Sequence, residues 1–511
     1  MPASEPSAAP GDRSGGAPGG ALGDAPGDVL GDAPRARETN AAPEAPAPPK
    51  SVLDAMARAD AAARGRRLGE AGGICTDVLA EMPDYPPALA LLGTLLGHRG
   101  ETARGIQLLE RAIARNREVA LWHSNLAALH RFAYRFDEGL NAARTAVRLA
   151  PANPGFLVNL GIAHADRGEY DEATNCYLAA LGREQENPAA HLALAQALLA
   201  RGDFAPGWLE YEWRNKIEQA KGMLPKMSAA PWNGMRLPGA RLLAVADQGF
   251  GDSIQFCRYI PLIAGRAGEL VIGCSAELAP LFSRIPGVAR AYHRWGDIPA
   301  HAAYCLLSSL PLLLRTDAVS IPCEVPYLAP DPARVAAWGP RLDEILPQGR
   351  MRVGIAWSGR TTHPNDRRRS LKLEQLQPLG RLPNLVLVPL QTRLAPADAK
   401  ALAGIPNAVD LTQDLKDFGE SAAIMMHLDL VVSIDTAAAH LAGALGRPVS
   451  LLLPRPADWR WQHERRDSPW YPSMRLYRQP RPGDWEAVIA EVAEALALQA
   501  AGRAGGTIPR A

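Results

Sequence analysis

The spacing of apolar side chains changes once along the chain, near residue 215. Before that point apolar residues recur every three or four positions, a spacing that predicts amphipathic helices. After it, apolar runs of strand length alternate with helical patterns. Such alternation predicts parallel sheets with helices on their faces. The pattern therefore predicts an all-α region followed by α/β domains.

Small residues recur with a period of 34 positions in the helical region. They form parallel series: Gly93, Ala127, Gly161 and Ala195; Gly105, Gly139, Ala173 and Gly207; and Gly100, Gly168 and Gly202, with Tyr134 in place of the remaining glycine. A period of 34 with small residues at these positions resembles the tetratricopeptide repeat (TPR). The resemblance implies four repeats from about Tyr85 to Arg214, and a weaker first repeat at 52–84.

A single TPR unit cannot bury its own apolar face, so neighbouring units stack into a solenoid with a concave surface. This surface predicts a groove for a protein or peptide partner. The solenoid could equally serve as a spacer or a dimerisation arm. The sequence leaves these alternatives open, and it does not define the oligomeric state.

The apolar runs after residue 215 fall into two blocks. Strands are expected at 241–246, 269–274, 289–293 and 304–307, and then at 352–357, 385–390, 428–434 and 448–453. A final amphipathic helix is expected at 485–498. Two α/β domains place a cleft between them, and open α/β sheets bind ligands beyond the carboxyl ends of their strands. The loops after Ala246, Trp357 and Ile434 are therefore the first candidates for chemistry.

These patterns divide the chain into six segments. Residues 1–50 and 502–511 are rich in Ala, Gly and Pro with few bulky apolar residues, a composition that predicts disordered tails. Between the tails we expect the solenoid at 51–215, a first α/β domain at 216–335, a linker at 336–350 and a second α/β domain at 351–501. A linker is expected because the stretch 322–340, between the two α/β blocks, is rich in proline.

Charge and cysteine content narrow the class of protein. The 511 residues hold 55 Lys+Arg and 54 Asp+Glu, a net charge of +1, which argues against a nucleic-acid binder. Six scattered cysteines without metal-type spacing predict reduced thiols in a cytoplasmic protein. We expect no transmembrane segment, because no apolar run approaches the ~18–20 residues that span a bilayer. The N-terminal sequence also lacks the pattern of a secretory signal.

The loop after the first strand holds Gly249, Gly251 and Asp252. Glycines let a ligand approach the backbone closely, and the N-terminus of the helix that follows offers free N–H groups to an anion. Asp252 has a structural alternative, because Asp is a favoured residue at the start of a helix.

The loop after 352–357 is strongly basic. Arg360, Arg367, Arg368, Arg369 and Lys372 lie within thirteen residues. Guanidinium groups match phosphate oxygens in bidentate pairs, so this loop is a candidate diphosphate site. A solvated basic loop is the alternative interpretation.

The loop after 428–434 begins with Asp435 and Thr436 and leads into a helix of small residues that carries His440. The Thr436 hydroxyl and the N–H groups up to Ala438 lie at a helix N-terminus, where an anion binds favourably. His440 follows a little over one turn later. It could face the same ligand, or it could be a structural histidine with its hydrogen bonds satisfied.

The segment from Asp435 to Pro448, D-T-A-A-A-H-L-A-G-A-L-G-R-P, resembles the D-T-x-x-x-H-L-A-A-A-L-x-x-P signature of bacterial heptosyltransferases. These belong to the GT-B glycosyltransferases, and Gly251-Asp252 is similar to their early Gly-Asp motif. The resemblance spans roughly 237–498. It implies a GT-B fold, two Rossmann-like domains with a nucleotide-sugar donor between them and no further cofactor. The layout is similar to protein O-GlcNAc transferases, but their Pro-Tyr-Asn-Gly-His run after Asp-Thr is missing.

The same resemblance assigns roles to the candidate residues. Donor or phosphate contacts fall to Gly249, Gly251, Arg368, Arg369, Lys372, Asp435, Thr436 and Ala437. Asp252 and His440 are the catalytic candidates, with Asp252 as general base on the acceptor hydroxyl. The chain contains no Asp-x-Asp, so a metal-independent, inverting transfer is expected, with Arg or Lys in place of a cation.

Departures from the heptosyltransferase pattern change the expected acceptor. A repeat solenoid is not part of those enzymes, so a polypeptide is expected in place of a lipid core. Ala437 removes a polar or glycine position after Asp-Thr. The Trp- and Arg-rich segment 458–471 could stack on a sugar or base, or pack the wall of a sheet. The alternative function is a TPR scaffold whose GT-B domain is no longer catalytic.

Overall fold

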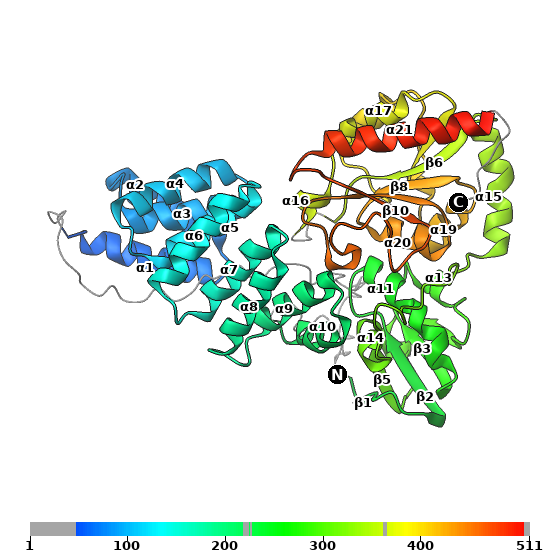
Figure 1. Cartoon of the computed structure of the whole chain (residues 1–511), viewed down its shortest axis with the longest axis horizontal. Coiled ribbons are helices and arrows are strands. Elements are labelled where there is room, and N and C mark those ends of the chain that lie inside the picture. Colours follow the sequence, from blue (N-terminus) through cyan, green and yellow to red (C-terminus); the bar gives the residue numbers. More distant parts are fainter. Residues whose placement is uncertain (1–46, 218–223, 225–226, 361–364, 505–511) are drawn as a thin grey trace, which may run out of the picture.

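The computed structural model describes residues 47–217, 224, 227–360 and 365–504. The tails expected at 1–50 and 502–511 lie outside these residues, except for 47–50 and 502–504. A helical solenoid stands beside two α/β domains that lie one above the other (Figure 1). Among the described residues, no helix is long and apolar enough to cross a membrane.

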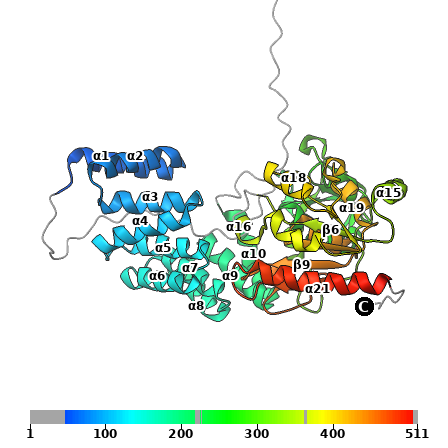
Figure 2. The same ribbon diagram turned by 90° about the horizontal axis from the view of Figure 1, so that it is seen from above.

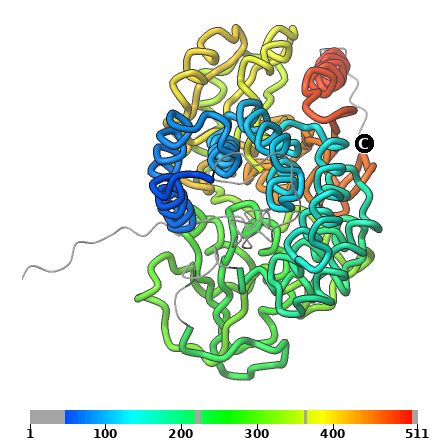
Figure 3. The backbone as a smooth tube through the Cα atoms, turned by 90° about the vertical axis from the view of Figure 1, so that its left-hand side faces the viewer, coloured from blue at the N-terminus to red at the C-terminus, as the bar shows by residue number. Residues whose placement is uncertain are grey.

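Residues 50–211 form ten helices that pair into five consecutive units. The helices are α1 (Lys50–Arg64), α2 (Leu68–Glu81), α3 (Pro86–His98), α4 (Thr102–Arg115), α5 (Ala120–Phe132), α6 (Phe136–Leu149), α7 (Pro154–Asp166), α8 (Tyr170–Leu181), α9 (Pro188–Arg201) and α10 (Phe204–Tyr211). The pair α1 and α2 confirms the weaker first unit expected at 52–84. The units follow an arc, which is seen with the solenoid toward the viewer in Figure 3.

The small residues of the sequence lie where paired helices meet. A Cβ added at Gly93 would lie 2.8 Å from the Gly105 carbonyl oxygen, and a Cβ at Gly105 would lie 2.5 Å from the Gly93 oxygen. The backbones of α3 and α4 are therefore in direct contact, as the period predicts. The third series occupies the turns inside the units: Gly100, Gly168 and Gly202 have φ of 93°, 79° and 90°, and Tyr134 has φ of 58°.

Each α/β domain is built on a five-stranded sheet whose strands pair in parallel. The first sheet has the order β1-β5-β2-β3-β4, with β1 (Ala230–Pro231), β2 (Leu237–Val245), β3 (Ala267–Gly273), β4 (Arg290–Tyr292) and β5 (Ala303–Leu306). Its helices are α11 (Phe250–Phe256), α12 (Ile260–Ala264), α13 (Ala279–Phe282) and α14 (Leu310–Leu313).

The second sheet has the order β10-β9-β8-β6-β7, with β6 (Met351–Ala356), β7 (Leu385–Pro389), β8 (Leu430–Ile434), β9 (Val449–Leu453) and β10 (Met474–Arg478). Its helices are α16 (Asp366–Arg369), α17 (Gln377–Gly380), α18 (Pro396–Ala403), α19 (Phe418–Met425), α20 (Ala437–Ala444) and α21 (Trp485–Ala504). Every residue of β7, β8 and β9 is buried. Strands covered on both faces need no polar side, which explains why these sequences are apolar apart from Ser433 and Ser450.

Every strand expected from an apolar run is present, with ends that differ by at most four residues. The sequence did not predict β1 or β10. A strand of two residues carries no period, and β10 lies at an edge of its sheet with arginines at Arg475 and Arg478.

The segment expected as a linker is not an irregular connection. Most of residues 336–350 belongs to α15 (Pro332–Ile345), which starts after Asp331 with its proline in the first turn. Trp338 and Leu342 of this helix are buried, and the Trp338 indole donates a hydrogen bond of 2.7 Å to Glu420 on α19. One of the prolines that indicated a linker, Pro332, instead begins a helix that packs on the second α/β domain.

The last repeat shares a hydrophobic core with both α/β domains. Trp208 on α10 is 1% exposed, and its ring packs edge-on against Phe256 of the first domain and Trp459 and Trp470 of the second. Its indole N–H donates to the Thr316 carbonyl oxygen at 3.0 Å. The C-terminal end of the solenoid is thereby anchored to both domains.

A second set of contacts follows the length of the solenoid, which lies beside the second α/β domain (Figure 2). The turns at Gly100, Tyr134, Gly168 and Gly202 lie against Arg367, Gly483, His463 and Gln462, respectively. Arg367 also donates a hydrogen bond of 3.1 Å to the His98 carbonyl oxygen. We call these four equivalent turns the docking turns, because successive units use them to contact the second α/β domain.

Candidate functional site

A cavity of about 1010 Å³ lies where the solenoid and the two α/β domains meet. Its walls include all three loops that the sequence singled out, with Gly249–Asp252, Ser358–Arg360 and Asp435–Ala438. These loops follow β2, β6 and β8, so the cavity lies at the carboxyl ends of parallel strands. Helices α7 and α9 of the solenoid close another side.

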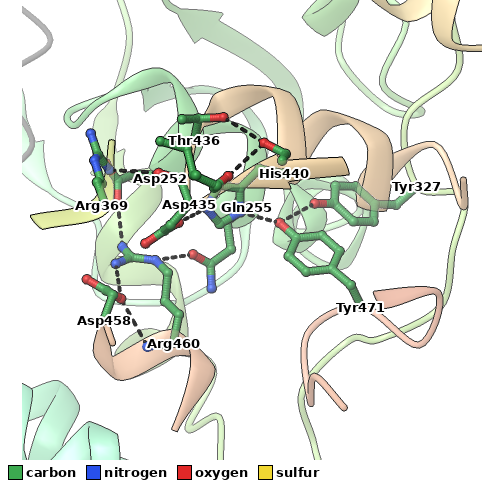
Figure 4. Close-up of polar contacts among 12 residues, drawn as sticks. Asp252, Gln255, Tyr327, Arg369, Asp435, Thr436, His440, Asp458, Arg460 and Tyr471 are labelled. Carbon is green, nitrogen blue, oxygen red and sulfur yellow. Dashed lines mark hydrogen bonds and ion pairs between the residues drawn. The ribbon is translucent and has the colours of Figure 1, made fainter. Parts of the chain in front are cut away.

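Asp435 and Thr436 lie between the end of β8 and the start of α20. Thr436 occupies the N-cap position of α20, and Ala437 is the first residue of that helix. The Asp435 carboxylate lies 3.6 Å from His440 Nε2, and Arg369 donates a hydrogen bond of 2.9 Å to the Asp435 carbonyl oxygen (Figure 4). Burial would raise the pKa of Asp435, but His440 and Arg369 together hold it well below its usual range. Asp435 is therefore a carboxylate anion.

His440 is held by protein groups on both sides of its ring. It is 4% exposed, and its Nδ1 lies 2.8 Å from the Tyr471 hydroxyl, while Nε2 faces Asp435. The Tyr471 hydroxyl lies 3.4 Å from that of Tyr327, which donates to the Ile254 carbonyl oxygen on α11 at 3.0 Å (Figure 4). This chain of polar groups links α20 to α11 across the two domains, a role that fits positioning of Asp435.

Gly251 lies directly against His440. A Cβ on this residue would approach His440 Cδ2 to 2.9 Å, a distance that requires one of them to move. The glycine therefore lets α11 and α20 approach each other, a different reason from the backbone–ligand contact expected from the sequence. Gly249 precedes α11 and lines the cavity.

Gly251→Ala is expected to destabilise the protein by about 1–3 kcal/mol, because an added methyl group must displace a buried and hydrogen-bonded imidazole. Denaturant unfolding measures the change. Gly296→Ala is the matched control, since no atom lies within 4 Å of the methyl group that it adds. Equal stability of the two variants would show that the α11–α20 contact is not tight.

Asp252 lines the cavity as the first member of a charged network. It forms an ion pair with Arg460, whose Nη1 also binds Asp458 Oδ1 at 2.9 Å and whose Nε donates to the Gln255 side chain (Figure 4). Burial would lower the pKa of Arg460, but Asp458 and Asp252 hold it above its usual value. The sequence did not assign a role to Arg460, although the Asp-Trp-Arg-Trp run at 458–461 marked its position.

Two adjacent arginines of the basic loop, Arg368 and Arg369, have different partners. Arg369 lines the cavity beside Asp435. Arg368 also reaches the cavity, but its guanidinium donates two hydrogen bonds, of 3.0 and 3.1 Å, to Asp166 on α7. Asp166 in turn accepts a bond of 2.7 Å from Arg131 on α5. Arg368 therefore holds the solenoid rather than standing free for a phosphate.

Lys372 is not brought to the site. It is exposed, it does not line the cavity, and its backbone N–H binds the Gln375 side chain. Trp470 is also remote from the cavity surface, because it is fully buried in the core around Trp208. The structural alternative therefore fits Trp470, whereas Trp459 reaches the cavity wall.

The fold and the cavity define a class of protein: a TPR solenoid followed by a region of parallel sheets, with a cavity between them. The tetratricopeptide repeat family model matches residues 129–174 and 158–205, which confirms the repeats. Protein FlbA of Caulobacter vibrioides is 30% identical over 449 residues, which cover 81% of this chain and 73% of FlbA. The chain belongs to the FlbA family.

Solved structures of repeat proteins resemble part of the chain. MamA MSR-1 C2 is 21% identical, with a TM-score of 0.28 over 33% of this chain and 97% of MamA. The thermophilic TPR protein TTC0263 of Thermus thermophilus is 19% identical, with a TM-score of 0.31 over 33% of this chain and 93% of that protein.

Proposed function

We propose that the chain is a glycosyltransferase that moves a sugar from a nucleotide-sugar to a polypeptide held by the solenoid. The observation that carries the proposal is the cavity at the carboxyl ends of β2, β6 and β8, which combines carboxylates with arginines and a helix N-terminus. Two Rossmann-like domains around such a cavity fit the GT-B architecture that the sequence resemblance implies.

The proposed donor site lies on the second α/β domain. The first N–H groups of α20, around Thr436 to Ala438, have no partners within the helix and favour an anion. Arg369 supplies a positive charge beside them. Together these groups suit the diphosphate of a nucleotide-sugar, and they would stabilise the charge that develops on it as the leaving group.

Asp252 is the proposed general base. As the acceptor oxygen bonds to the anomeric carbon of the sugar, the hydroxyl proton passes to the Asp252 carboxylate. The bond from that carbon to the diphosphate breaks, and its electron pair stays on the diphosphate. Attack opposite the leaving group inverts the anomeric carbon. Arg460 holds Asp252 in place through their ion pair, and His440 positions Asp435.

Arg369→Ala is expected to weaken nucleotide binding at least about 10-fold, because one charge-assisted contact to a phosphate contributes about 1.5–3 kcal/mol. Calorimetry with ADP, GDP, UDP and CDP in the presence of a chelator measures the affinity and tests the metal-independent proposal. Lys372→Ala is the control. The sequence predicted this lysine to contact the donor, but Lys372 does not line the cavity. The nucleotide affinity of this variant should therefore equal that of the wild type.

The nucleotide panel also separates the enzyme from the scaffold. Binding of one nucleotide that is weakened by Arg369→Ala supports the donor site. No binding of any of the four by the folded wild-type protein, with or without Mg²⁺, would contradict the proposal and favour a TPR scaffold without catalytic activity.

A further inference from the structure

The two sides of the cavity differ in charge. The second α/β domain contributes charged groups of both signs, among them Arg360, Arg369, Asp398 and Asp417. The solenoid contributes mainly small or uncharged side chains: Ile162, Ala165, Tyr170, Ala193, Gln196 and Ala197. Its charged lining residues, Arg131 and Asp166, are paired with each other, and Asp166 is also paired with Arg368. We call the six-residue surface the solenoid wall.

The cavity is large for a single small ligand. Its volume of about 1010 Å³ is at the upper limit of the ~300–1,000 Å³ that encloses a single small molecule. A second cavity, between α5, α6 and α7, shares Arg131, Ile162 and Asp166 with it, but its volume of about 30 Å³ has room only for a water molecule or two. The space for an acceptor therefore lies within the first cavity, along the side that the solenoid closes.

We propose that the solenoid wall is the acceptor subsite, and that it takes a polypeptide whose residues around the modified hydroxyl are small and uncharged. This inference rests on the proposed function. Alanines on α7 and α9 leave space for a peptide backbone, and the half-buried side chain of Gln196 can hydrogen-bond to peptide groups. A charged residue beside the hydroxyl would lose its hydration at a wall whose own charges are already paired.

The test uses the full chain and three fluorescein-labelled peptides. Each peptide has one serine, flanked on both sides by Ala and Gly, by Asp, or by Lys. Fluorescence anisotropy measures peptide affinity in the presence of the nucleotide that binds best in the panel. We expect the wild type to bind the Ala/Gly peptide at least about 10-fold more tightly than either charged peptide, and a lipid phosphate in detergent not at all.

Gln196→Glu places a carboxylate of the same size on the solenoid wall. We expect it to weaken binding of the Ala/Gly peptide and to improve binding of the Lys peptide, each by about fivefold or more, while nucleotide affinity stays within twofold. Gln185→Glu is the control, because Gln185 is an exposed residue of the solenoid outside the cavity, and all three peptide affinities should be unchanged.

The outcomes separate the inference from the function on which it rests. A wild-type preference for a charged peptide, tighter binding of the lipid phosphate, or equal behaviour of Gln196→Glu and Gln185→Glu would overturn the acceptor subsite while nucleotide binding stays intact. Absence of nucleotide binding would overturn the proposed function, and with it the inference.

Discussion

Asp252→Asn is expected to lose sugar transfer by about 10²–10⁴-fold while it keeps its nucleotide affinity. The amide has the shape of the carboxylate, and its oxygen can still accept a hydrogen bond from Arg460, but it cannot take the proton of the acceptor hydroxyl. The loss should therefore appear in the turnover rate and not in donor binding. Single-turnover transfer to a peptide and calorimetry with the nucleotide measure the two effects separately.

Asp297→Asn is the matched control for that experiment. Asp297 is an exposed aspartate of the same α/β domain and does not line the cavity, so its substitution should leave transfer at the wild-type rate. An Asp252→Asn variant that transfers sugar as fast as this control would remove Asp252 from the reaction. Another group at the cavity would then have to accept the proton.

Asp166→Asn is expected to lower the free energy of unfolding by about 3–5 kcal/mol, because it removes the buried negative charge that pairs with the buried Arg368. The Asp166 side chain is 4% exposed and contacts Arg131 of the solenoid and Arg368 of the second α/β domain. Its neutralisation should loosen the junction between the two parts. Denaturant unfolding measures the stability, and limited proteolysis should release the solenoid faster than in the wild type.

The chain offers a close control for this effect. Asp84 also accepts hydrogen bonds from two arginines, Arg111 at 2.8 Å and Arg115 at 2.7 Å, but its side chain is 51% exposed. Water replaces an exposed ion pair at little cost. Asp84→Asn should therefore unfold like the wild type, and an equal loss of stability in both variants would show that burial of the Asp166 cluster is not the cause.

The elements that the sequence predicted well are those with local signals. The strands that are buried on both faces carry mainly apolar runs, as at Leu430–Ile434, and repeated small residues define the helix pairs. The prediction of a linker was wrong. It took prolines such as Pro332 and Pro340 as signs of an irregular segment, whereas Pro332 begins a helix and Pro340 lies within it. Proline composition does not distinguish these cases.

The candidate site was located by the strand-end rule, which correctly brought the loops of Asp252, Arg369 and Asp435 to one cavity. Individual side chains were harder to assign. Arg368 and Arg369 are adjacent in sequence, yet one binds the solenoid and the other faces Asp435, because successive residues of the short helix α16 point in different directions. The role of Arg460 depends on its ion pair with Asp252, which lies 208 positions away in the sequence, so no local pattern could indicate it.

The docking turns restrict how this architecture can change over generations. Repeat arrays commonly lengthen or shorten when a whole unit of the gene is duplicated or lost. Here a unit gained or lost between Gly100 and Gly202 would move every later turn away from its partner on the second α/β domain and would displace Trp208 from Thr316. Units can be added before α1 without disturbing any of these contacts. We therefore expect relatives to vary in repeat number at the N-terminal end and to keep the last four units constant.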